Sequence, residues 1–192
     1  MFDKILIANR GEIAVRIIRA CREMGIKTVA VFSEPDREAL HTQLADDSVC
    51  IGSAKVSDSY LNVTNIISAA VEKKVQAIHP GFGFLSENST FAAMCEECNI
   101  KFIGPSAKVI DALGNKSNAR DMMIKAGVPV IPGSDGVTQD ASQAHEVAAR
   151  LGYPVIVKAS AGGGGKGIRI VRAKEDLEEA FESARSETIK AF

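Results

Sequence analysis

The sequence predicts an α/β protein built around a parallel β-sheet with helices on both faces. Three observations support this class. Through the first half of the chain, short apolar runs bounded by glycine and proline alternate with stretches of helical periodicity. The apolar runs are rich in β-branched residues, which strands favour. Hydrophobic residues make up 46% and charged residues 24% of the chain, which is the balance of a globular domain.

The first half is expected to alternate strands with helices. The predicted strands are residues 4–8, 27–32, 49–51, 75–78 and 101–103. Helices are predicted at 62–71 and 90–98, and a first helix is predicted from Ile13, Ile17, Ala20, Cys21 and Met24, which recur at helical spacing before Gly25. Parallel sheets bind ligands beyond the carboxyl ends of their strands, and residues 9–11 and 79–83 fall there.

The second half is expected to form helices and then a strand–loop–strand hairpin. Helices are predicted at residues 106–113, 115–126 and 141–151. The hairpin consists of a strand at 153–158, a glycine-rich loop at 159–167 and a strand at 168–172, in which apolar and basic residues alternate as in a half-exposed strand. A helical stripe follows and continues to Phe192.

The turn after the first strand is not a dinucleotide-binding fingerprint. It contains Gly11 alone, whereas the G-x-G-x-x-G motif needs three glycines. The sequence therefore predicts a Rossmann-like shape without NAD binding. Asn9 and Gly11 fit a helix cap and a tight turn, or a contact with a ligand, and both interpretations stay open.

Charge and composition argue against several classes of protein. The net charge of −1 gives no basic surplus for non-specific nucleic-acid binding. No apolar run approaches the roughly 18 residues of a membrane span, and the first strand pattern starts at once, so we expect no membrane segment, no signal peptide and a cytoplasmic protein. Cys95 and Cys98 lie in a predicted helix, on one face with Phe91 and Met94, which favours a core stripe over a metal or redox site.

The glycine-rich hairpin loop carries the strongest chemical signal. It fails the Walker A pattern, because Ser160 stands where the first glycine is needed and Gly167 follows Lys166. Gly162-x-Gly164-x-x-Gly167 instead resembles the flap that covers phosphates in kinases, since successive glycines let backbone N–H groups approach an anion. With Lys158 at its base and Lys116 upstream, we favour a site for nucleotide phosphates. A surface hairpin with solvated lysines is the alternative.

Six strings of residues resemble the biotin carboxylase family in the same order along the whole chain. They are residues 7–14 (IANRGEIA), 79–88 (HPGFGFLSEN), 102–105 (FIGP), 127–129 (GVP), 132–134 (PGS) and 157–167 (VKASAGGGGKG). The resemblance is strongest to the subunits that serve bacterial acetyl-CoA carboxylase in fatty acid synthesis. Pyruvate and propionyl-CoA carboxylases share the same strings.

The resemblance implies a Rossmann-like N-terminal domain at residues 1–113, of the kind that precedes an ATP-grasp domain. It also implies the first part of that ATP-grasp domain at 114–192. The implied ligase activates bicarbonate with ATP and Mg²⁺ and carboxylates biotin on a carrier protein. The implied ATP-binding residues are Lys116, Lys158, Gly162, Gly163, Gly164, Gly165, Lys166 and Gly167. Phe82 and Gly83 would lie near biotin, with Phe82 where relatives often carry Tyr, and Lys166 stands where many carry Arg.

On the family pattern, the catalytic base, the bicarbonate-binding residues and the Mg²⁺ ligands come after residue 192. The chain is therefore expected to be a fragment that is inactive alone, from a parent enzyme that works with a biotin carboxyl carrier protein and a carboxyltransferase. The parent is expected to be a homodimer through the first helix, where Arg19 and Glu23 are neighbours. Another ATP-grasp ligase, or a non-catalytic nucleotide-binding module, remains an alternative.

Overall fold

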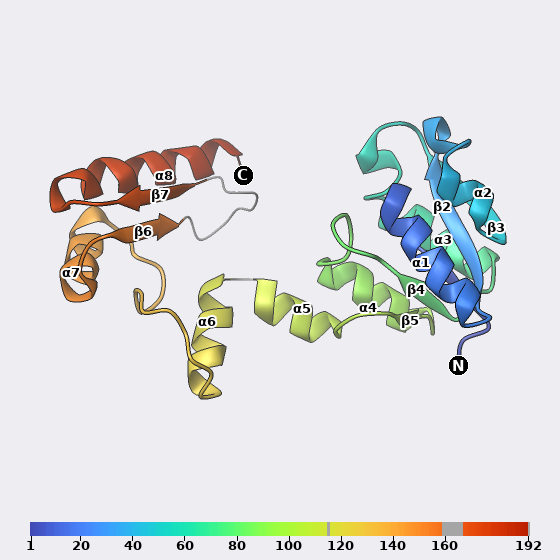
Figure 1. The fold of residues 1–192 in the computed structure, drawn as a ribbon, viewed down its shortest axis with the longest axis horizontal. Helices are drawn as coiled ribbons and strands as arrows, with labels where there is room; N and C mark the ends of the chain where they lie inside the picture. Colours follow the sequence, from blue (N-terminus) through green and yellow to red (C-terminus); the bar gives the residue numbers. More distant parts are fainter. Residues whose placement is uncertain (115, 159–166, 192) are drawn as a thin grey trace. The chain divides into compact units, whose positions relative to one another are not determined.

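The computed structural model describes residues 1–114, 116–158 and 167–191. These residues fall into two compact units, Met1–Asp111 and Ala112–Phe192 (Figure 1).

The first unit is built on a five-stranded sheet in which all neighbouring strands are parallel. The strand order is β3-β2-β1-β4-β5, as in a Rossmann-like sheet. The strands are β1 (Lys4–Ile7), β2 (Lys27–Ser33), β3 (Asp47–Gly52), β4 (Ala77–His79) and β5 (Lys101–Phe102). The predicted α/β class with a parallel sheet is confirmed.

Helices cover both faces of this sheet, because the residues of a strand point alternately to opposite sides. Ile5 and Ile7 of β1 pack on one side with residues of α1 (Gly11–Glu23). Leu6 packs on the other side with residues from α3 (Val63–Glu72), α4 (Ser89–Glu97) and α5 (Ala107–Gly114). A short helix that the sequence analysis did not predict, α2 (Leu40–Leu44), follows the 3₁₀ turn η1 (Glu34–Asp36), and η2 (Val56–Asp58) precedes α3.

The predicted core stripe of α1 is wrong in part. Ala20 and Met24 are exposed, and the residues of this helix that are buried are Ala14, Val15, Ile18 and Cys21. Apolar residues stand on more than one side of this helix, so its periodicity allows two stripes, and packing against the sheet selects one of them. The stripe predicted for α4 is likewise corrected at one end. Phe91 and Cys95 are fully buried, whereas Cys98 caps the helix and is exposed.

The second unit contains a two-stranded antiparallel hairpin, β6 (Val155–Lys158) and β7 (Ile168–Val171). Residues of α7 (Ala141–Leu151) and α8 (Leu177–Ala191) share a small core with one face of the hairpin, around Ala148, Val171 and Leu177. The unit also includes α6 (Lys116–Lys125) and the 3₁₀ turn η3 (Lys174–Asp176). Among the described residues, no helix is both long and apolar enough to cross a membrane.

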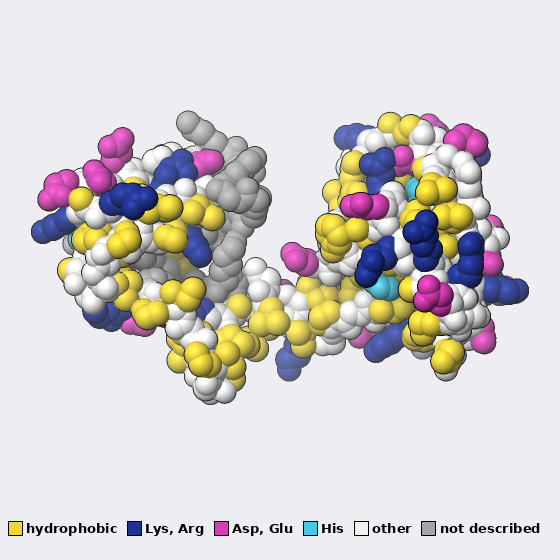
Figure 2. Space-filling view, in the orientation of Figure 1, with side chains coloured by type: hydrophobic (Ala, Val, Ile, Leu, Met, Phe, Trp, Pro, Cys, Tyr) yellow, Lys and Arg dark blue, Asp and Glu magenta, His cyan; other side chains and the backbone are white. Residues whose placement is uncertain are grey.

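The two faces of the hairpin differ from a simple apolar-in, polar-out arrangement. Ile156, Ile168 and Ile170 are 55%, 42% and 62% exposed, although all three are apolar. Arg169 points to the other face, where it is partly covered and pairs with Glu187 of α8 at 2.9 Å. Figure 2 shows hydrophobic side chains at the surface over this part of the second unit. One sheet face of the unit is therefore apolar and open.

Candidate functional site

In the first unit, the loops after β1 and β4 meet at the point where the strand order of the sheet reverses. These two strands are neighbours, with Ile7 beside His79, and the N–H of Ala8 donates to the carbonyl of His79 at 2.9 Å. The chain leaves β1 for one side of the sheet and β4 for the other, which opens a crevice between the two loops. Ligands of sheets of this class bind at this position.

Asn9 ties the two loops together. Its side chain is 3% exposed, and its Nδ2 donates to the carbonyl oxygens of Pro80 at 2.8 Å and Phe82 at 2.9 Å. Gly81 has a φ of +65°, and a Cβ there would meet the Asn9 Nδ2 at 2.7 Å. The helix-cap interpretation of Asn9 is wrong, because Arg10 is the N-cap of α1 and no side chain caps the helix. The left-handed φ of Gly11, +56°, does fit a tight turn.

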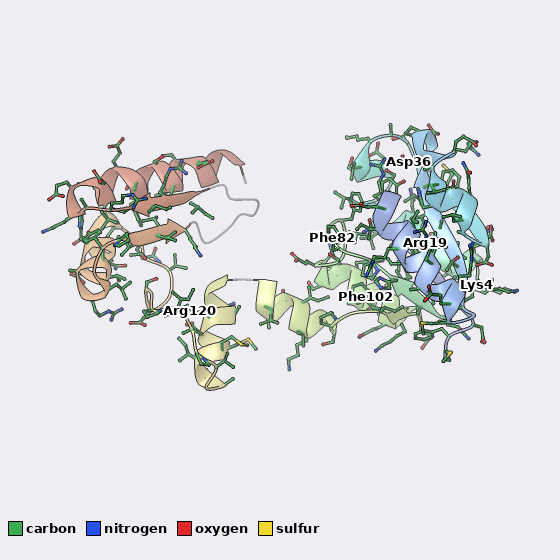
Figure 3. All side chains as sticks on the ribbon, in the orientation of Figure 1. Lys4, Arg19, Asp36, Phe82, Phe102 and Arg120 are labelled. Carbon is green, nitrogen blue, oxygen red and sulfur yellow. The ribbon has the colours of Figure 1, made fainter. Side chains whose placement is uncertain are left out.

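Phe82 and Gly83, the residues that the resemblance places near biotin, lie in the loop after β4. Phe82 is 69% exposed although it is a large aromatic residue (Figure 3). Gly83 has a φ of +68° and has open space where a side chain would start. In the same loop, His79 accepts a hydrogen bond at Nδ1 from the N–H of Gly81 at 3.0 Å, and burial lowers the pKa of His79. The imidazole is therefore neutral at pH 7 and holds the loop as an acceptor.

Phe84 of this loop and three side chains beside the loop form a cluster that is not apparent from the sequence. Arg10 donates to Asp36 at 2.6 Å, and the hydroxyl of Tyr60 donates to the other Asp36 oxygen at 2.6 Å. The ring of Tyr60 stacks on Phe84, with centroids 5.2 Å apart and an angle of 18° between the planes. The guanidinium of Arg10 lies 5.6 Å from the centre of the Tyr60 ring. We call Arg10, Asp36, Tyr60 and Phe84 the loop cluster.

The electrostatics of the loop cluster favour an ionised Asp36 and a protonated Tyr60. Burial alone would raise the pKa of Asp36, but hydrogen bonds from Arg10, Tyr60 and Ser33 outweigh it and the pKa is lowered. Burial and the hydrogen bond to Asp36 raise the pKa of Tyr60 to about 12. No local sequence pattern predicts that these residues are in contact, since Arg10 and Asp36 are 26 positions apart and Asp36 and Tyr60 are 24 apart.

In the second unit, the described part of the predicted phosphate site lies at the open end of the hairpin. Lys158 is the last residue of β6, is exposed, and is paired with Ile168 of β7. Gly167 precedes β7 with a φ of +68°, and its N–H donates to a Glu187 oxygen at 3.1 Å. Lys116 is the first residue of α6, and its side chain lies outside the described residues. Gly162, Gly163, Gly164, Gly165 and Lys166 also lie outside them.

The open face of the hairpin places an amine beside apolar side chains. Because side chains alternate along a strand, Ile156 and Lys158 share one face, and the paired residues Ile170 and Ile168 lie on the same face of β7. Lys158 is apparent as a candidate from the sequence, whereas these isoleucines are not. The described residues contain no group of three or more His, Cys, Asp or Glu side chains that could hold a metal ion.

The fold defines a class: a Rossmann-like domain followed by part of a domain that carries a glycine-rich hairpin. Comparison with known families makes the class specific. Residues 1–110 match the family described as the biotin carboxylase N-terminal domain. Residues 115–192 match the carbamoyl-phosphate synthase L chain ATP-binding domain. The chain belongs to the biotin carboxylase family, and the resemblance on which this prediction was based is confirmed.

Individual biotin-dependent carboxylases are similar to this chain over its whole length. Biotin carboxylase 1 of Bacillus subtilis is 56% identical over 192 residues, which are 100% of this chain and 43% of the relative. The 2-oxoglutarate carboxylase small subunit of Hydrogenobacter thermophilus is 52% identical, over 100% of this chain and 40% of the relative. The chain thus spans less than half the length of these relatives.

Solved structures agree as well. A Campylobacter jejuni biotin carboxylase in complex with β,γ-ATP matches with a TM-score of 0.93 and 53% identity, over 100% of this chain and 43% of the other. The biotin carboxylase domain dimer of the Hydrogenobacter thermophilus 2-oxoglutarate carboxylase, bound to MgADP, ADP and bicarbonate, matches with a TM-score of 0.89 and 50% identity, over 100% and 42%.

Proposed function

We propose that this chain is the N-terminal part of a biotin carboxylase, which uses ATP and bicarbonate to carboxylate biotin on a carrier protein. The observation that carries the proposal is the open face of the hairpin, where Lys158 stands beside Ile156 and Ile168 at the start of a glycine-rich loop. An apolar strand face suits a flat base, and an amine with successive glycines suits the phosphates attached to it. The ATP complex of the Campylobacter jejuni relative supports this assignment.

Each predicted site residue keeps its role as part of the proposal. Lys116 and Lys158 neutralise the charge of the nucleotide phosphates, and Gly162, Gly163, Gly164, Gly165, Lys166 and Gly167 form the loop over them. Lys166 supplies a point charge without the two-pronged geometry of Arg. Phe82 and Gly83 face biotin in the first unit. Mg²⁺ offsets the phosphate charge, and the MgADP complex of a relative supports its use. The domain boundary at 113/114 belongs to the same proposal.

We also propose a reaction, a location and partners for the full-length parent protein. We assign it to the first half-reaction of acetyl-CoA carboxylase in the cytoplasm, together with a biotin carboxyl carrier protein, a carboxyltransferase and a second copy of itself. The dimer described for the Hydrogenobacter thermophilus relative supports the last partner. Relatives named 2-oxoglutarate carboxylase and methylcrotonoyl-CoA carboxylase show that the final acceptor differs among proteins with this N-terminal part.

The role of Lys158 can be tested in a full-length protein that contains this chain. A hydrogen bond from a charged group is worth about 1.5–3 kcal/mol, so Lys158→Ala should lower kcat/KM for ATP by about ten- to a hundredfold, and Lys116→Ala should act alike. ATP cleavage that depends on biotin and bicarbonate is the measurement. Lys174→Ala, at an exposed lysine in the same unit, is the matched control and should leave the kinetics unchanged. If Lys158→Ala behaves like the control, Lys158 is a solvated surface residue.

We also propose that the activity needs a protein of the relatives' length. The relatives are more than twice as long as this chain, which covers 43% of the Bacillus subtilis enzyme. The 192-residue chain alone should therefore release no phosphate from ATP above background when biotin and bicarbonate are present. Phosphate release that depends on biotin, at roughly 1 s⁻¹ or more, would contradict this expectation and favour an active site complete within the chain.

A further inference from the structure

We propose that the loop cluster of Arg10, Asp36, Tyr60 and Phe84 is a positioning device that fixes the loop at residues 80–85 and so sets where Phe82 stands. The proposal rests on the proposed function in one point, that Phe82 faces biotin. It adds four residues that act on Phe82 through the loop rather than by touching substrate.

At its start, the loop is held by hydrogen bonds from Asn9 to its backbone. Asn9 binds the carbonyl oxygens of Pro80 and Phe82, which lie on either side of Gly81. These contacts fix the peptide group between Pro80 and Gly81 and the one between Phe82 and Gly83. They do not reach the backbone beyond Gly83, where a φ of +68° turns the chain and other contacts must fix it.

Phe84 holds the loop from the other side. Its φ is +44°, in the left-handed region that is strained for an aromatic residue. Such a conformation persists only where the surroundings determine it. The turn hydrogen bond from the N–H of Ser86 to the carbonyl of Gly83 and the buried Leu85 hold the backbone on either side of Phe84. The stacked contact with Tyr60 holds its side chain, and the Tyr60 side of the stack is rigid because Tyr60 is 3% exposed. The ring of Tyr60 is thus a rigid surface against which Phe84 of the loop packs.

Tyr60 is itself fixed at its hydroxyl. The oxygen accepts from the N–H of Ser33 at 3.0 Å and donates to Asp36 at 2.6 Å, so both of its roles are used. Asp36 also accepts from the Ser33 hydroxyl at 3.0 Å and from Arg10. Ser33 ends β2 and Arg10 follows β1 by a short turn. The position of Phe82 therefore depends on the ends of three neighbouring strands, β1, β2 and β4.

The chain offers a direct probe of this arrangement, because it contains no tryptophan. Phe82→Trp introduces a single tryptophan, which can be excited apart from the tyrosines, at a side chain that is 69% exposed, so the ring can be accommodated. In this background, Tyr60→Phe removes the hydroxyl and keeps the ring, whereas Phe84→Ala removes the stack. Tyr153→Phe changes the other tyrosine, which lies in the second unit, and is the matched control.

We expect Tyr60→Phe and Phe84→Ala to lower the fluorescence anisotropy of the introduced tryptophan and to raise its quenching by acrylamide, with Tyr153→Phe unchanged. Amide hydrogen exchange in β1 and β4 should stay as in the Phe82→Trp protein, which separates a moved loop from an unfolded domain. Unchanged anisotropy and quenching in both variants would overturn the proposal. The proposal would also be overturned if anisotropy fell only in variants whose amides in β1 and β4 also exchange faster. The cluster would then only stabilise the fold. Tyr60→Phe keeps the ring and so remains informative if Phe84→Ala fails to fold.

A second measurement links the loop to the proposed function. In the full-length protein with Phe82 intact, Tyr60→Phe should lower kcat/KM for free biotin by about ten- to a hundredfold, because small displacements of a binding group have effects of this size. KM for ATP should not change, and Tyr153→Phe should change neither. Equal losses for biotin and ATP would overturn the positioning role. A wild-type protein that shows no cleavage of ATP with biotin would refute the proposed function, while the anisotropy result would still decide the positioning of the loop.

Discussion

Asp36 collects hydrogen bonds from three side chains, Arg10, Tyr60 and Ser33. These donors lower its pKa below the ordinary aspartate value of 3.8 even though burial acts in the opposite direction. A carboxyl group whose pKa is lower in the folded than in the unfolded state stabilises the fold above its ordinary pKa. That contribution is lost as the pH falls through the folded pKa. The ionised form of Asp36 is therefore a stabilising element at neutral pH.

Asp36→Asn should lower the free energy of unfolding at pH 7 by about 1.5–3 kcal/mol, the range for hydrogen bonds to a charged group. Arg10 is half exposed, so screening by solvent keeps its share small. The deficit relative to wild type should shrink as the pH falls from 3.8 through the lower pKa of the folded state, because wild-type Asp36 takes up a proton over this range. Urea unfolding at a series of pH values measures this difference, with Glu38→Gln at an exposed carboxylate as control. A deficit that does not vary with pH would show that the charge of Asp36 contributes nothing.

At the scale of the element, the sequence predicts the order of strands and helices better than the face each one buries. Strands such as β2 contain a continuous apolar run, here residues 29–32, and the helices have clear stops, so their existence follows from local patterns. The five-residue helix α2 is too short for helical periodicity to register. The buried faces of α1 and β7 were not predictable, because apolar residues stand on more than one side of α1 and packing against α8 draws Arg169 of β7 inward.

Some residues of the candidate site can likewise be predicted from the sequence, and others cannot. The lysines and the glycine run are visible in the sequence because their composition is local, and their role in binding ATP stays a prediction. The loop cluster was invisible, because its residues come from segments that only the strand order brings together. Asn9 was noticed, but its partner Pro80, in the loop after β4, lies 71 positions away, and a cap was the nearest local explanation.

The open apolar face of the hairpin leads to a test at two neighbouring elements. Leu177 of α8 is 1% exposed in the small core of the second unit, whereas Ile170 of β7 is 62% exposed. Leu177→Ala should destabilise the second unit by about 2–5 kcal/mol, the range for a buried leucine. Ile170→Ala, a similar loss of methyl groups on the open face, should change stability by no more than about 0.5 kcal/mol. Amide hydrogen exchange in α7 and α8 reports this unit separately. Comparable losses of protection in the two variants would show that the isoleucine face is covered in solution.

At the scale of the whole molecule, the outer side of α1 is the surface that suggests self-association. Arg19 and Glu23 are exposed, and the corrected burial of α1 adds the exposed Ala20 and Met24 beside them. Lys and Arg side chains gather over α1 in Figure 2, and Arg19 is labelled on this helix in Figure 3. A charged pair four residues apart on one helix is worth only a few tenths of a kcal/mol. Across a two-fold axis, however, Arg19 of each subunit can meet Glu23 of the other, so the pair forms twice.

Charge reversal separates these two interpretations in the full-length protein. Arg19→Glu should place like charges across the axis and weaken the proposed dimer, whereas adding Glu23→Arg restores opposite charges and should recover part of the association. Lys108→Glu, at an exposed residue of α5, changes the net charge equally and serves as the control. Sedimentation over a concentration series measures all four proteins. If the wild type is monomeric at concentrations where stable dimers persist, or if Arg19→Glu sediments like the control, α1 is not the interface. Recovery of the dimer in the double variant is the decisive result. If Arg19 and Glu23 paired only within one helix, reversing their charges would not change association.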